Sequence, residues 1–226
     1  MSMSVPFSAV LFDAYGTLLD LGFITEKAEQ AFPGHGAQLA TLWRDKQLNY
    51  TWLRTISENY ADFASVTADA LDYSIERLGL TASRQKREEL LAAYWFLPSF
   101  PEAPATLVHL RQKGVRLGIL SNGTPAMLEA ALRSSGLDGL FDDVLSVDAA
   151  GCYKTARAAY QLGTTRLALP PERILFVSSN GWDICGAIWF GYRTYWVNRA
   201  KQPAERLGVS AYATGESLKD LAALFA

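Results

Sequence analysis

The chain contains few of the residues that mark a disulfide framework, a zinc cluster or a nucleic-acid surface. Only two of its 226 residues are cysteines, and neither Cys152 nor Cys185 belongs to a CxxC pair or a His/Cys cluster. This argues against a disulfide-stapled fold and suits a reducing compartment. Lysine and arginine number 21 against 23 aspartates and glutamates, with no basic block, so the charge pattern gives no support to nucleic-acid binding.

Long apolar runs are also missing. No segment approaches the roughly 20 uninterrupted apolar residues of a membrane span, and residues 1–6 have neither a basic start nor a long apolar stretch. We therefore expect a soluble, cytoplasmic protein with no membrane partner. Half of the residues are apolar, which is enough to build a substantial core.

The first informative feature is a carboxylate at the end of an apolar run. Residues Ala9 to Phe12 predict a buried strand, and Asp13 follows it directly. Open α/β sheets place their ligands beyond the carboxyl ends of their strands. A carboxylate backed by a dry sheet is either paired, protonated or used as a nucleophile, which makes Asp13 a candidate catalytic residue.

The two parts of the chain differ in their predicted secondary structure. Residues 21–97 show no convincing strand and predict helices, whereas the proline-rich segment 97–104 breaks the helical pattern and marks a boundary. Beyond it, strands alternate with helices, which predicts right-handed crossovers and a mostly parallel sheet. The predicted helices are 39–60, 66–78, 83–96, 105–113, 125–135, one from near 155, 183–190 and 218–225, and the later strands are 115–120, 143–147, 174–178 and 192–197.

We therefore predict an α/β fold, with a doubly wound, Rossmann-like sheet as core and an inserted helical cap. The core domain is expected to comprise residues 1–20 and 99–226, and the cap domain residues 21–98. The ends of three strands, at Asp13, Ser121 and Ser178, should converge at one edge of the sheet, with the cap above them as a lid.

Further polar residues follow these strand ends. Ser121 and Asn122 can donate hydrogen bonds to an anion, and Asn180 and Asp183 follow the third strand. Lys154 precedes a predicted helix from which it can reach the same point. Taken singly, each pattern is more often a plain turn or a solvated charge.

Together these residues resemble the haloacid dehalogenase superfamily, and within it the L-2-haloacid dehalogenases. The resemblance covers nearly the whole chain. It rests on Phe12-Asp-Ala-Tyr-Gly-Thr-Leu18, Leu120-Ser-Asn-Gly123, Lys154, Phe176-Val-Ser-Ser-Asn-Gly-Trp-Asp-Ile-Cys-Gly-Ala187, Trp196-Val-Asn-Arg199 and the cap motif Trp43-Arg-Asp-Lys-Gln-Leu-Asn-Tyr-Thr-Trp-Leu53.

Two departures separate the chain from the phosphatases of that superfamily. Phosphatases usually carry a second Asp two positions after the nucleophile to protonate the leaving alcohol, and here that position is Tyr15. A phenol with a pKa near 10 is a poor proton donor at neutral pH, but a halide needs no proton to leave. The acidic motif that helps to hold magnesium has Ser179 in place of its first Asp, which weakens a magnesium site.

The resemblance implies a hydrolase that converts short L-2-haloalkanoates into D-2-hydroxyalkanoates without metal or cofactor. Asp13 would attack C2 of the 2-haloacid and form an ester with inverted configuration. Thr17, Ser121 and Lys154 would orient the carboxylates, and Arg44 with Asn122 would hold the halide. Arg44 shares a helix face with Leu48 and Trp52, where without the resemblance it would be a snorkelling arginine.

The second step would deliver water to the ester. Asp183 would activate the water, positioned by Lys154 and assisted by Ser178 and Asn180, and Tyr160 would hold this network from the next helix. An apolar pocket that strips water from the substrate would be walled by Tyr15, Leu48, Phe63 and Trp182. Plain core packing is the competing interpretation of these side chains.

Two residues depart from the dehalogenase pattern itself. Thr155 stands where proline commonly follows the lysine, and Asp45 stands beside Arg44 where a neutral residue is common.

Two other functions stay open: a magnesium-dependent phosphatase for a small phosphate ester, and a catalytically weak relative that binds small carboxylates or serves a partner protein. Relatives are commonly homodimers, so a homodimer is expected here. Residue types do not reveal the halogen, the accepted chain length or the natural substrate.

Overall fold

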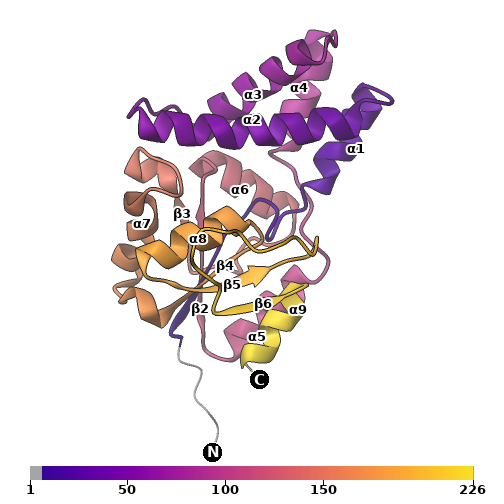
Figure 1. Ribbon diagram of the computed structural model, residues 1–226. Helices are drawn as coiled ribbons and strands as arrows, with labels where there is room; N and C mark the ends of the chain where they lie inside the picture. The colour runs from indigo at the N-terminus through magenta and orange to yellow at the C-terminus, as the bar shows by residue number, and fades with distance from the viewer. Residues whose placement is uncertain (1–6, 226) are drawn as a thin grey trace, which may run out of the picture.

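The computed structural model describes residues 7–225 and has a helical cap above an α/β core (Figure 1). Within these residues, six strands form one sheet in the order β3-β2-β1-β4-β5-β6, and every neighbouring pair is parallel. The strands are β1 (Ala9–Phe12), β2 (Arg116–Ser121), β3 (Asp143–Ser146), β4 (Ile174–Ser178), β5 (Arg193–Val197) and β6 (Ala213–Gly215). The predicted doubly wound parallel sheet is confirmed.

The central position of β1 explains where a ligand binds. Strands β1 and β4 are fully buried and lie side by side, and the chain winds away from them in opposite directions. Such a reversal opens a crevice at the carboxyl ends of the two central strands. The backbone amide of Asp13 extends this pairing by donating to the carbonyl of Val177 over 2.9 Å, so Asp13 lies at the crevice.

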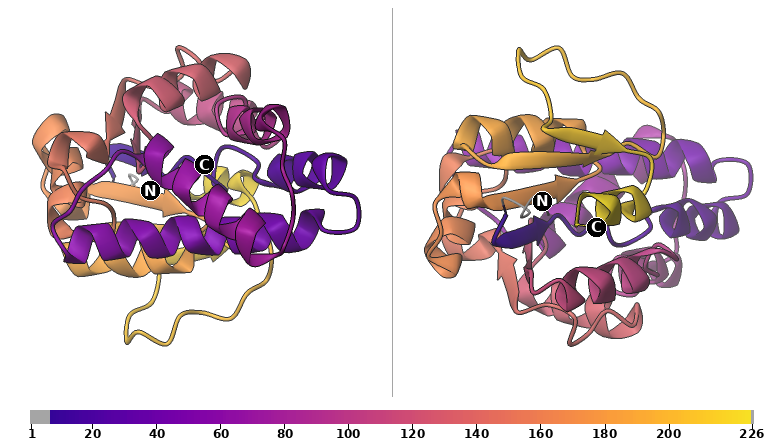
Figure 2. Two further views of the ribbon diagram at one scale, coloured as in Figure 1. Left: turned by 90° about the horizontal axis from the view of Figure 1, so that it is seen from above. Right: turned by 90° about the horizontal axis from the view of Figure 1, so that it is seen from below.

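Helices cover both faces of the sheet (Figure 2). Helices α7 and α8 pack together on one face, α5 and α9 pack together on the other, and α6 packs against β3. Their bounds are α5 (Ala103–Gln112), α6 (Pro125–Ser134), α7 (Arg157–Leu167), α8 (Gly181–Phe190) and α9 (Leu218–Ala222), and short 3-10 turns occupy Val147–Ala150, Pro171–Arg173 and Ala223–Phe225. None of the helices within residues 7–225 is long and apolar enough to cross a membrane.

Four helices form the cap, which lies over the carboxyl end of the sheet (Figure 1). They are α1 (Gly22–Ala31), α2 (Gly36–Ile56), α3 (Phe63–Arg77) and α4 (Arg84–Ala93). The long helix α2 packs against both α1 and α3. The buried indole of Trp43 donates from Nε1 to the carbonyl of Thr67 over 2.8 Å, which fixes α2 against α3.

The two connections between cap and core run side by side. The amide of Asp20 donates to the carbonyl of Pro98 over 2.8 Å, and the amide of Phe100 donates to the carbonyl of Leu18 over 2.9 Å. This pairing supports the predicted boundaries after residue 20 and before residue 99, which stay a prediction. Residues 1–6 and 226 of the expected core domain lie outside the described part of the chain.

The sequence predicted most elements within a few residues, with three differences. Helix α2 ends at Ile56 and not at residue 60, and α4 ends at Ala93 and not at residue 96. The third is β6, which was not predicted, because its three residues Ala-Thr-Gly contain no apolar run. It is a strand because the edge of β5 offers free backbone groups with which it pairs.

The N-cap of α6 offers a test of how the loop after β2 is held. The Thr124 hydroxyl accepts a hydrogen bond from the amide of Met127 over 3.2 Å. Thr124→Ala should lower the free energy of unfolding by about 1 kcal/mol, measured by urea denaturation. Thr124→Ser keeps the acceptor and should stay close to the parent protein. Equal losses in both variants would contradict the capping role.

Candidate active site

A buried ammonium group joins two carboxylates at the carboxyl edge of the sheet. Lys154 Nζ lies 3.0 Å from Asp13 Oδ1 and 2.9 Å from Asp183 Oδ2. The side chains of Lys154 and Asp183 are fully buried, and that of Asp13 is 8% exposed. We call Asp13, Lys154 and Asp183 the charged triad. The ammonium also lies 4.8 Å from the ring centroid of Phe176, which adds a cation–π contact.

Three different elements supply the triad. Asp13 follows β1, Asp183 lies in the first turn of α8, and Lys154 belongs to the loop before α7. The side-chain oxygen Oδ1 of Asn122, just beyond β2, accepts a hydrogen bond from the backbone amide of Lys154 over 3.2 Å. The loop after β2 therefore fixes the lysine loop through its backbone, and the lysine side chain is free to reach both carboxylates.

The second oxygen of Asp13 has partners of its own. Oδ2 accepts hydrogen bonds from the Thr17 hydroxyl at 3.1 Å and from the Asn180 amide at 2.9 Å. The Thr17 oxygen in turn accepts from the backbone amide of Ser179 over 2.8 Å. Asp13 is thus held in one orientation by groups from three segments, which is the preorganisation that a nucleophile requires. Thr17 was expected beside the nucleophile, whereas Asn180 was expected to assist Asp183 and its amide contacts Asp13.

Asp183 has an environment suited to accepting a proton. Its Oδ1 accepts a hydrogen bond from the Tyr160 hydroxyl over 2.7 Å. Burial is the largest cause that raises the pKa of Asp183, and the charge of Asp13 raises it as well. The Lys154 ammonium lowers it, and the resulting pKa is about 6. The first turn of α8 directs this side chain inward to Lys154, by which the sequence analysis expected it to be positioned.

The same two acids govern the lysine. Burial by itself would lower the pKa of Lys154, but the charges of Asp13 and Asp183 and the hydrogen bonds to both raise it above its usual value. The lysine is therefore a permanent cation at neutral pH and not a base. It offsets the repulsion between two carboxylates and stabilises their ionised forms.

Ser121 and Ser178 lie at the ends of their strands, as predicted, and both are fully buried. The Ser121 hydroxyl oxygen accepts from the amide of Gly123 over 3.2 Å, and the Ser178 oxygen accepts from the amide of Asn180 over 3.1 Å. Both hydroxyls thus shape the turns that follow the strands, and each keeps its own hydrogen for donation. Within residues 7–225, Ser178 makes no hydrogen bond to Asp183.

Arg44 comes to the site from the cap. It is half-buried on α2, and its Nη1 donates to the side-chain oxygen of Gln47 one turn further along. Gln47 is fully buried and donates in turn to the Thr67 hydroxyl over 2.6 Å. The neighbouring Asp45 is exposed on the outer side of α2, so its charge points to solvent and not into the site.

The charge of Arg44 affects the pKa values of two neighbouring tyrosines. Burial raises the pKa of Tyr15 and raises that of Tyr94 to about 12, and the Arg44 guanidinium lowers both. Its field therefore reaches the Tyr15 phenol of the core and the Tyr94 phenol at the end of α4 in the cap. Sequence reasoning missed Gln47 and Tyr94; a glutamine three residues after Arg44, between buried helix positions, was the available signal for Gln47.

Two of the four predicted pocket residues lie together, and a third lies elsewhere. The rings of Tyr15 and Phe63 have centroids 5.5 Å apart. Leu48 is half-buried on the Arg44 face of α2. Trp182 contacts Trp52 of the cap edge to face, with ring centroids 5.7 Å apart, so it lies at the seam between α2 and α8.

The Tyr15 hydroxyl is buried and has no hydrogen-bond partner among residues 7–225. A Cβ at Gly123 would lie 3.0 Å from this oxygen, so glycine is needed there to let the phenol approach the loop after β2. Burying a hydroxyl without a partner costs free energy. An oxygen placed in this way is suited to bind a ligand atom beside Asn122.

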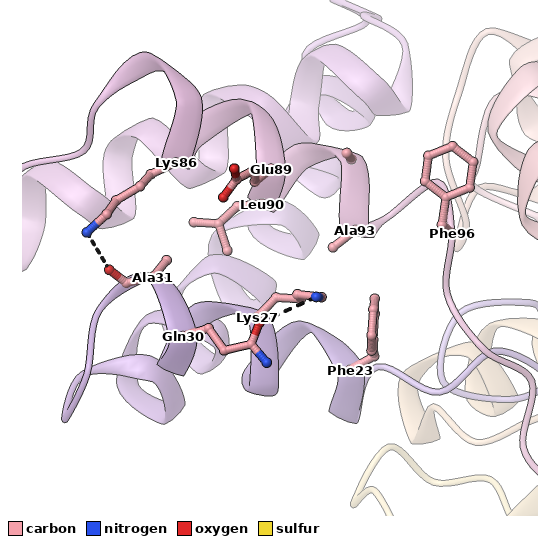
Figure 3. A pocket seen from close by; sticks show the side chains of 10 residues that line it. Phe23, Lys27, Gln30, Ala31, Lys86, Glu89, Leu90, Ala93 and Phe96 are labelled. Carbon is pink, nitrogen blue, oxygen red and sulfur yellow. Dashed lines mark hydrogen bonds between the residues drawn. The ribbon is translucent and has the colours of Figure 1, made fainter.

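A cavity within the cap is separate from these residues. It measures about 380 Å³ and lies between α1 and α4 (Figure 3). Its two lysines already have partners, since Lys86 donates to the carbonyl of Ala31 and Lys27 donates to the Gln30 side chain. It is a gap between two helices and contains no residue of the charged triad.

The charged triad can perform covalent catalysis by a carboxylate. Asp13 is a carboxylate held in one orientation, Asp183 is a buried acid with a raised pKa, and Lys154 balances the charge of both. Across residues 7–225, no three His, Cys, Asp or Glu side chains are grouped as metal ligands. Ser179, which stands where the phosphatase motif has an acid, contacts the Thr17 hydroxyl at 3.2 Å.

Comparisons with known proteins agree with this chemistry. Residues 7–191 match the family of haloacid dehalogenase-like hydrolases. The (S)-2-haloacid dehalogenase of Pseudomonas sp. (strain YL) is 41% identical over 216 residues, which cover 96% of this chain and 93% of that protein. The crystal structure of an L-2-haloacid dehalogenase superposes with a TM-score of 0.96 at 48% identity and covers 97% of this chain and 98% of the other.

A third relative connects the fold with a covalent intermediate. The L-2-haloacid dehalogenase of Xanthobacter autotrophicus, with chloropropionic acid covalently bound, superposes with a TM-score of 0.91 at 36% identity. The alignment covers 96% of this chain and 98% of that one. The chain therefore belongs to the haloacid dehalogenase superfamily of hydrolases and, within it, to the family of the L-2-haloacid dehalogenases.

Proposed function

We propose that this protein is an (S)-2-haloacid dehalogenase that hydrolyses short L-2-haloalkanoates to D-2-hydroxyalkanoates and halide. The observation that carries the proposal is the fixed Asp13 carboxylate, paired with Lys154 inside the protein, with Tyr15 and not an acid two residues later. A nucleophile without an adjacent proton donor suits a leaving group that departs as a stable anion. The 41% identical (S)-2-haloacid dehalogenase supports the same reaction.

In the first step, an oxygen of Asp13 attacks C2 of the substrate from the side opposite the halogen. The new C–O bond forms as the carbon–halogen bond breaks, and the bonding pair leaves with the halide. The product is an ester of Asp13 with inverted configuration at C2. Thr17 and Asn180 orient the attacking carboxylate, and the Lys154 ammonium offsets its repulsion from the substrate carboxylate, for which Ser121 is a hydrogen donor.

The departing halide needs positive charge and donors. Arg44 supplies charge from the cap and Asn122 an amide from the loop after β2, and both act where negative charge develops. The free hydrogen of Tyr15 lies beside the same loop. The aromatic wall of Tyr15 and Phe63 keeps water from the nucleophile, with Leu48 on the cap side.

In the second step, Asp183 takes a proton from a water molecule, whose oxygen attacks the ester carbonyl of Asp13. The tetrahedral intermediate collapses as the bond from the Asp13 carbonyl carbon to the ester oxygen breaks. Asp183 returns its proton to the departing alkoxide oxygen, so the hydroxy acid leaves, and Asp13 loses its acid proton to solvent and is again a carboxylate. Tyr160 and Lys154 hold Asp183 in place, while Ser178 fixes the turn that carries Asn180. Water attacks the ester carbonyl carbon of Asp13 and not C2, so the product keeps the inverted configuration that C2 acquired in the first step.

A phosphatase is the second candidate enzyme, since it would use Asp13, Ser121, Lys154 and Asp183 as well. Tyr15 and Ser179 do not favour it, because burial raises the pKa of Tyr15 further and Ser179 is a neutral partner of Thr17. A catalytically weak relative that only binds carboxylates is the third candidate.

The two free cysteines support a cytoplasmic location. Exposed Leu53 and Tyr73 on the cap support the proposal of a homodimer.

The reaction is tested by halide release from L- and D-2-chloropropionate, each with and without a chelator. We expect release from the L form alone, unaffected by the chelator. Asp13→Asn should lower release by a factor on the order of 10⁴ or more, as removal of a nucleophile does, and Asp45→Asn at the exposed neighbour of Arg44 is the matched control. Chelator-sensitive hydrolysis of a phosphate ester would favour the phosphatase. Binding without turnover, unchanged in Asp13→Asn, would favour the binding-only relative.

The raised pKa of Asp183 predicts a pH dependence of the second step. Because Asp183 must be ionised to accept a proton, ester hydrolysis should be constant above about pH 6 and fall about tenfold per unit below it. The Asp13 ester should then accumulate in acid, and quenching followed by mass spectrometry measures it. A protein that never accumulates ester down to pH 5 would contradict Asp183 as the base.

The free hydroxyl of Tyr15 predicts a separable contribution to the first step. Tyr15→Phe should lower kcat/KM about tenfold, the value of one lost hydrogen bond to a charged atom, with little change in stability. Tyr195 also has a buried hydroxyl without a partner among residues 7–225, so Tyr195→Phe is the matched control. Equal activities of the two variants would remove Tyr15 from the halide site.

A further inference from the structure

One sequence motif has no part in the proposed reaction. Trp196-Val-Asn-Arg199 begins in the last turn of β5, and its residues belong neither to the charged triad nor to the groups assigned to the halide. The side chains of Trp196 and Arg199 lead instead to the two turns that hold Asp13. We call Trp196 and Arg199 the β5 clamp.

Arg199 donates to the backbone of the loop that follows the nucleophile. Its Nη1 lies 3.2 Å from the carbonyl oxygen of Gly16, and its Nη2 lies 3.1 Å from that of Thr17. Gly16 has a φ of 85°, which favours glycine and makes the loop turn sharply after Asp13. The guanidinium therefore holds the backbone of this turn, while the Thr17 hydroxyl donates to Asp13.

Arg199 is itself anchored where the cap joins the core. Its Nη2 lies 2.9 Å from Oε1 of Glu102, and its Cζ lies 3.6 Å from the ring centroid of Phe100. The side chains of Arg199 and Glu102 are only 21% and 12% exposed, so solvent screens this ion pair less than a surface pair. Because a guanidinium is a rigid planar fork, its contacts with Glu102 and Phe100 also fix the direction of its bonds to the loop.

Trp196 acts on the second turn. Its Nε1 donates to the carbonyl of Ser179 over 3.1 Å. From the same turn, the backbone amide of Ser179 donates to the Thr17 hydroxyl, and the side-chain amide of Asn180 donates to Asp13 Oδ2. The two residues of the β5 clamp therefore hold two turns whose donors meet at one oxygen of Asp13.

We propose that Arg199 and Trp196 are positioning residues for the nucleophile. They fix the turns at residues 16–17 and 179–180, and through these turns they fix the direction of the Asp13 carboxylate. The inference rests on the proposed dehalogenase activity, since it assigns the β5 clamp to the step in which Asp13 attacks C2. Displacement in line with the carbon–halogen bond depends on orientation, and a shift of about 1 Å in a reacting group slows a reaction on the order of a hundredfold.

Formation of the Asp13 ester in a single turnover of L-2-chloropropionate, quenched and measured by mass spectrometry, tests the role of Arg199. Arg199→Met should slow ester formation about a hundredfold. Arg199→Lys keeps a charge for Glu102 but loses the fork that reaches two carbonyls, so it should remain about tenfold slow. Arg116→Met is the matched control, because it removes an arginine paired with the buried Asp143 at the β3 edge of the sheet. It should form the ester at the parent rate.

A double-mutant cycle separates positioning from a purely structural role. If Arg199 acts through Thr17, then Arg199→Met should slow ester formation less than about threefold once Thr17→Val has removed the hydroxyl. Trp196→Phe removes a single donor from the second turn and should slow ester formation about fivefold. Trp189→Phe, at an exposed tryptophan of α8, is its matched control and should leave the rate unchanged.

Urea denaturation of each variant measures stability separately from the rate. Ester formation at the parent rate in Arg199→Met and Trp196→Phe would overturn the positioning role and leave the dehalogenase in place. Arg199→Lys at the parent rate would also overturn it, because the ion pair with Glu102 would then be sufficient. Losses that multiply in the double variant with Thr17→Val would do the same.

Two further outcomes are decisive as well. If Arg199→Met does not fold, the rates of Arg199→Lys and Trp196→Phe decide by the same criteria. A parent protein that forms no ester from L-2-chloropropionate would overturn the dehalogenase, and the role of the β5 clamp with it.

Discussion

The structure of the site depends on one interaction, the bond of the buried Lys154 ammonium to two carboxylates. Lys154 lies within 3.0 Å of both Asp13 and Asp183, and its charge offsets the repulsion between the two carboxylates where little water screens them. Losing one partner of a buried ion pair costs on the order of 3–5 kcal/mol. The fold therefore has to bring three segments to one point and hold them there, and the parallel sheet does so by ending its central strands together.

The two substitutions away from the phosphatase pattern are coherent with each other. Ser179 and Tyr15 remove the acid ligand and the acid proton donor, while the ammonium between the two acids, which a phosphatase would also use, remains to offset their charge. A bare carboxylate attacks carbon better than one bound to a metal. The same α/β scaffold thus supports displacement at carbon through the change of a few side chains at two strand ends.

The sequence predicted the parts of this site that are attached to strand ends. A strand followed by Asp13, and a second one followed at a distance by Asp183, could be recognised because buried parallel strands are short apolar runs. What the sequence could not predict was the direction in which Asp183 points from α8. Successive side chains of a helix are rotated by about 100° per residue, and no local pattern resolves which of them faces the site. Gln47 was missed for a related reason, since its partner Thr67 lies on another helix. Strand β6 depends on the free edge of β5, and this tertiary pairing overrides a sequence without strand character.

The cap completes the site because it contributes groups that the core cannot. In the proposed reaction the core supplies the nucleophile, the base and the cation, and the halide would leave away from them, toward α2. Arg44 is placed there by the buried Gln47 and Trp43, which anchor α2 to α3. The hydrogen bonds between the two connecting segments, residues 18–20 and 98–100, hold one end of the cap to the core. The aromatic contact of Trp52 with Trp182 joins the far end of α2 to α8. A cap held at both ends keeps the guanidinium at a set distance from Asp13, and that distance decides whether charge leaving C2 is stabilised.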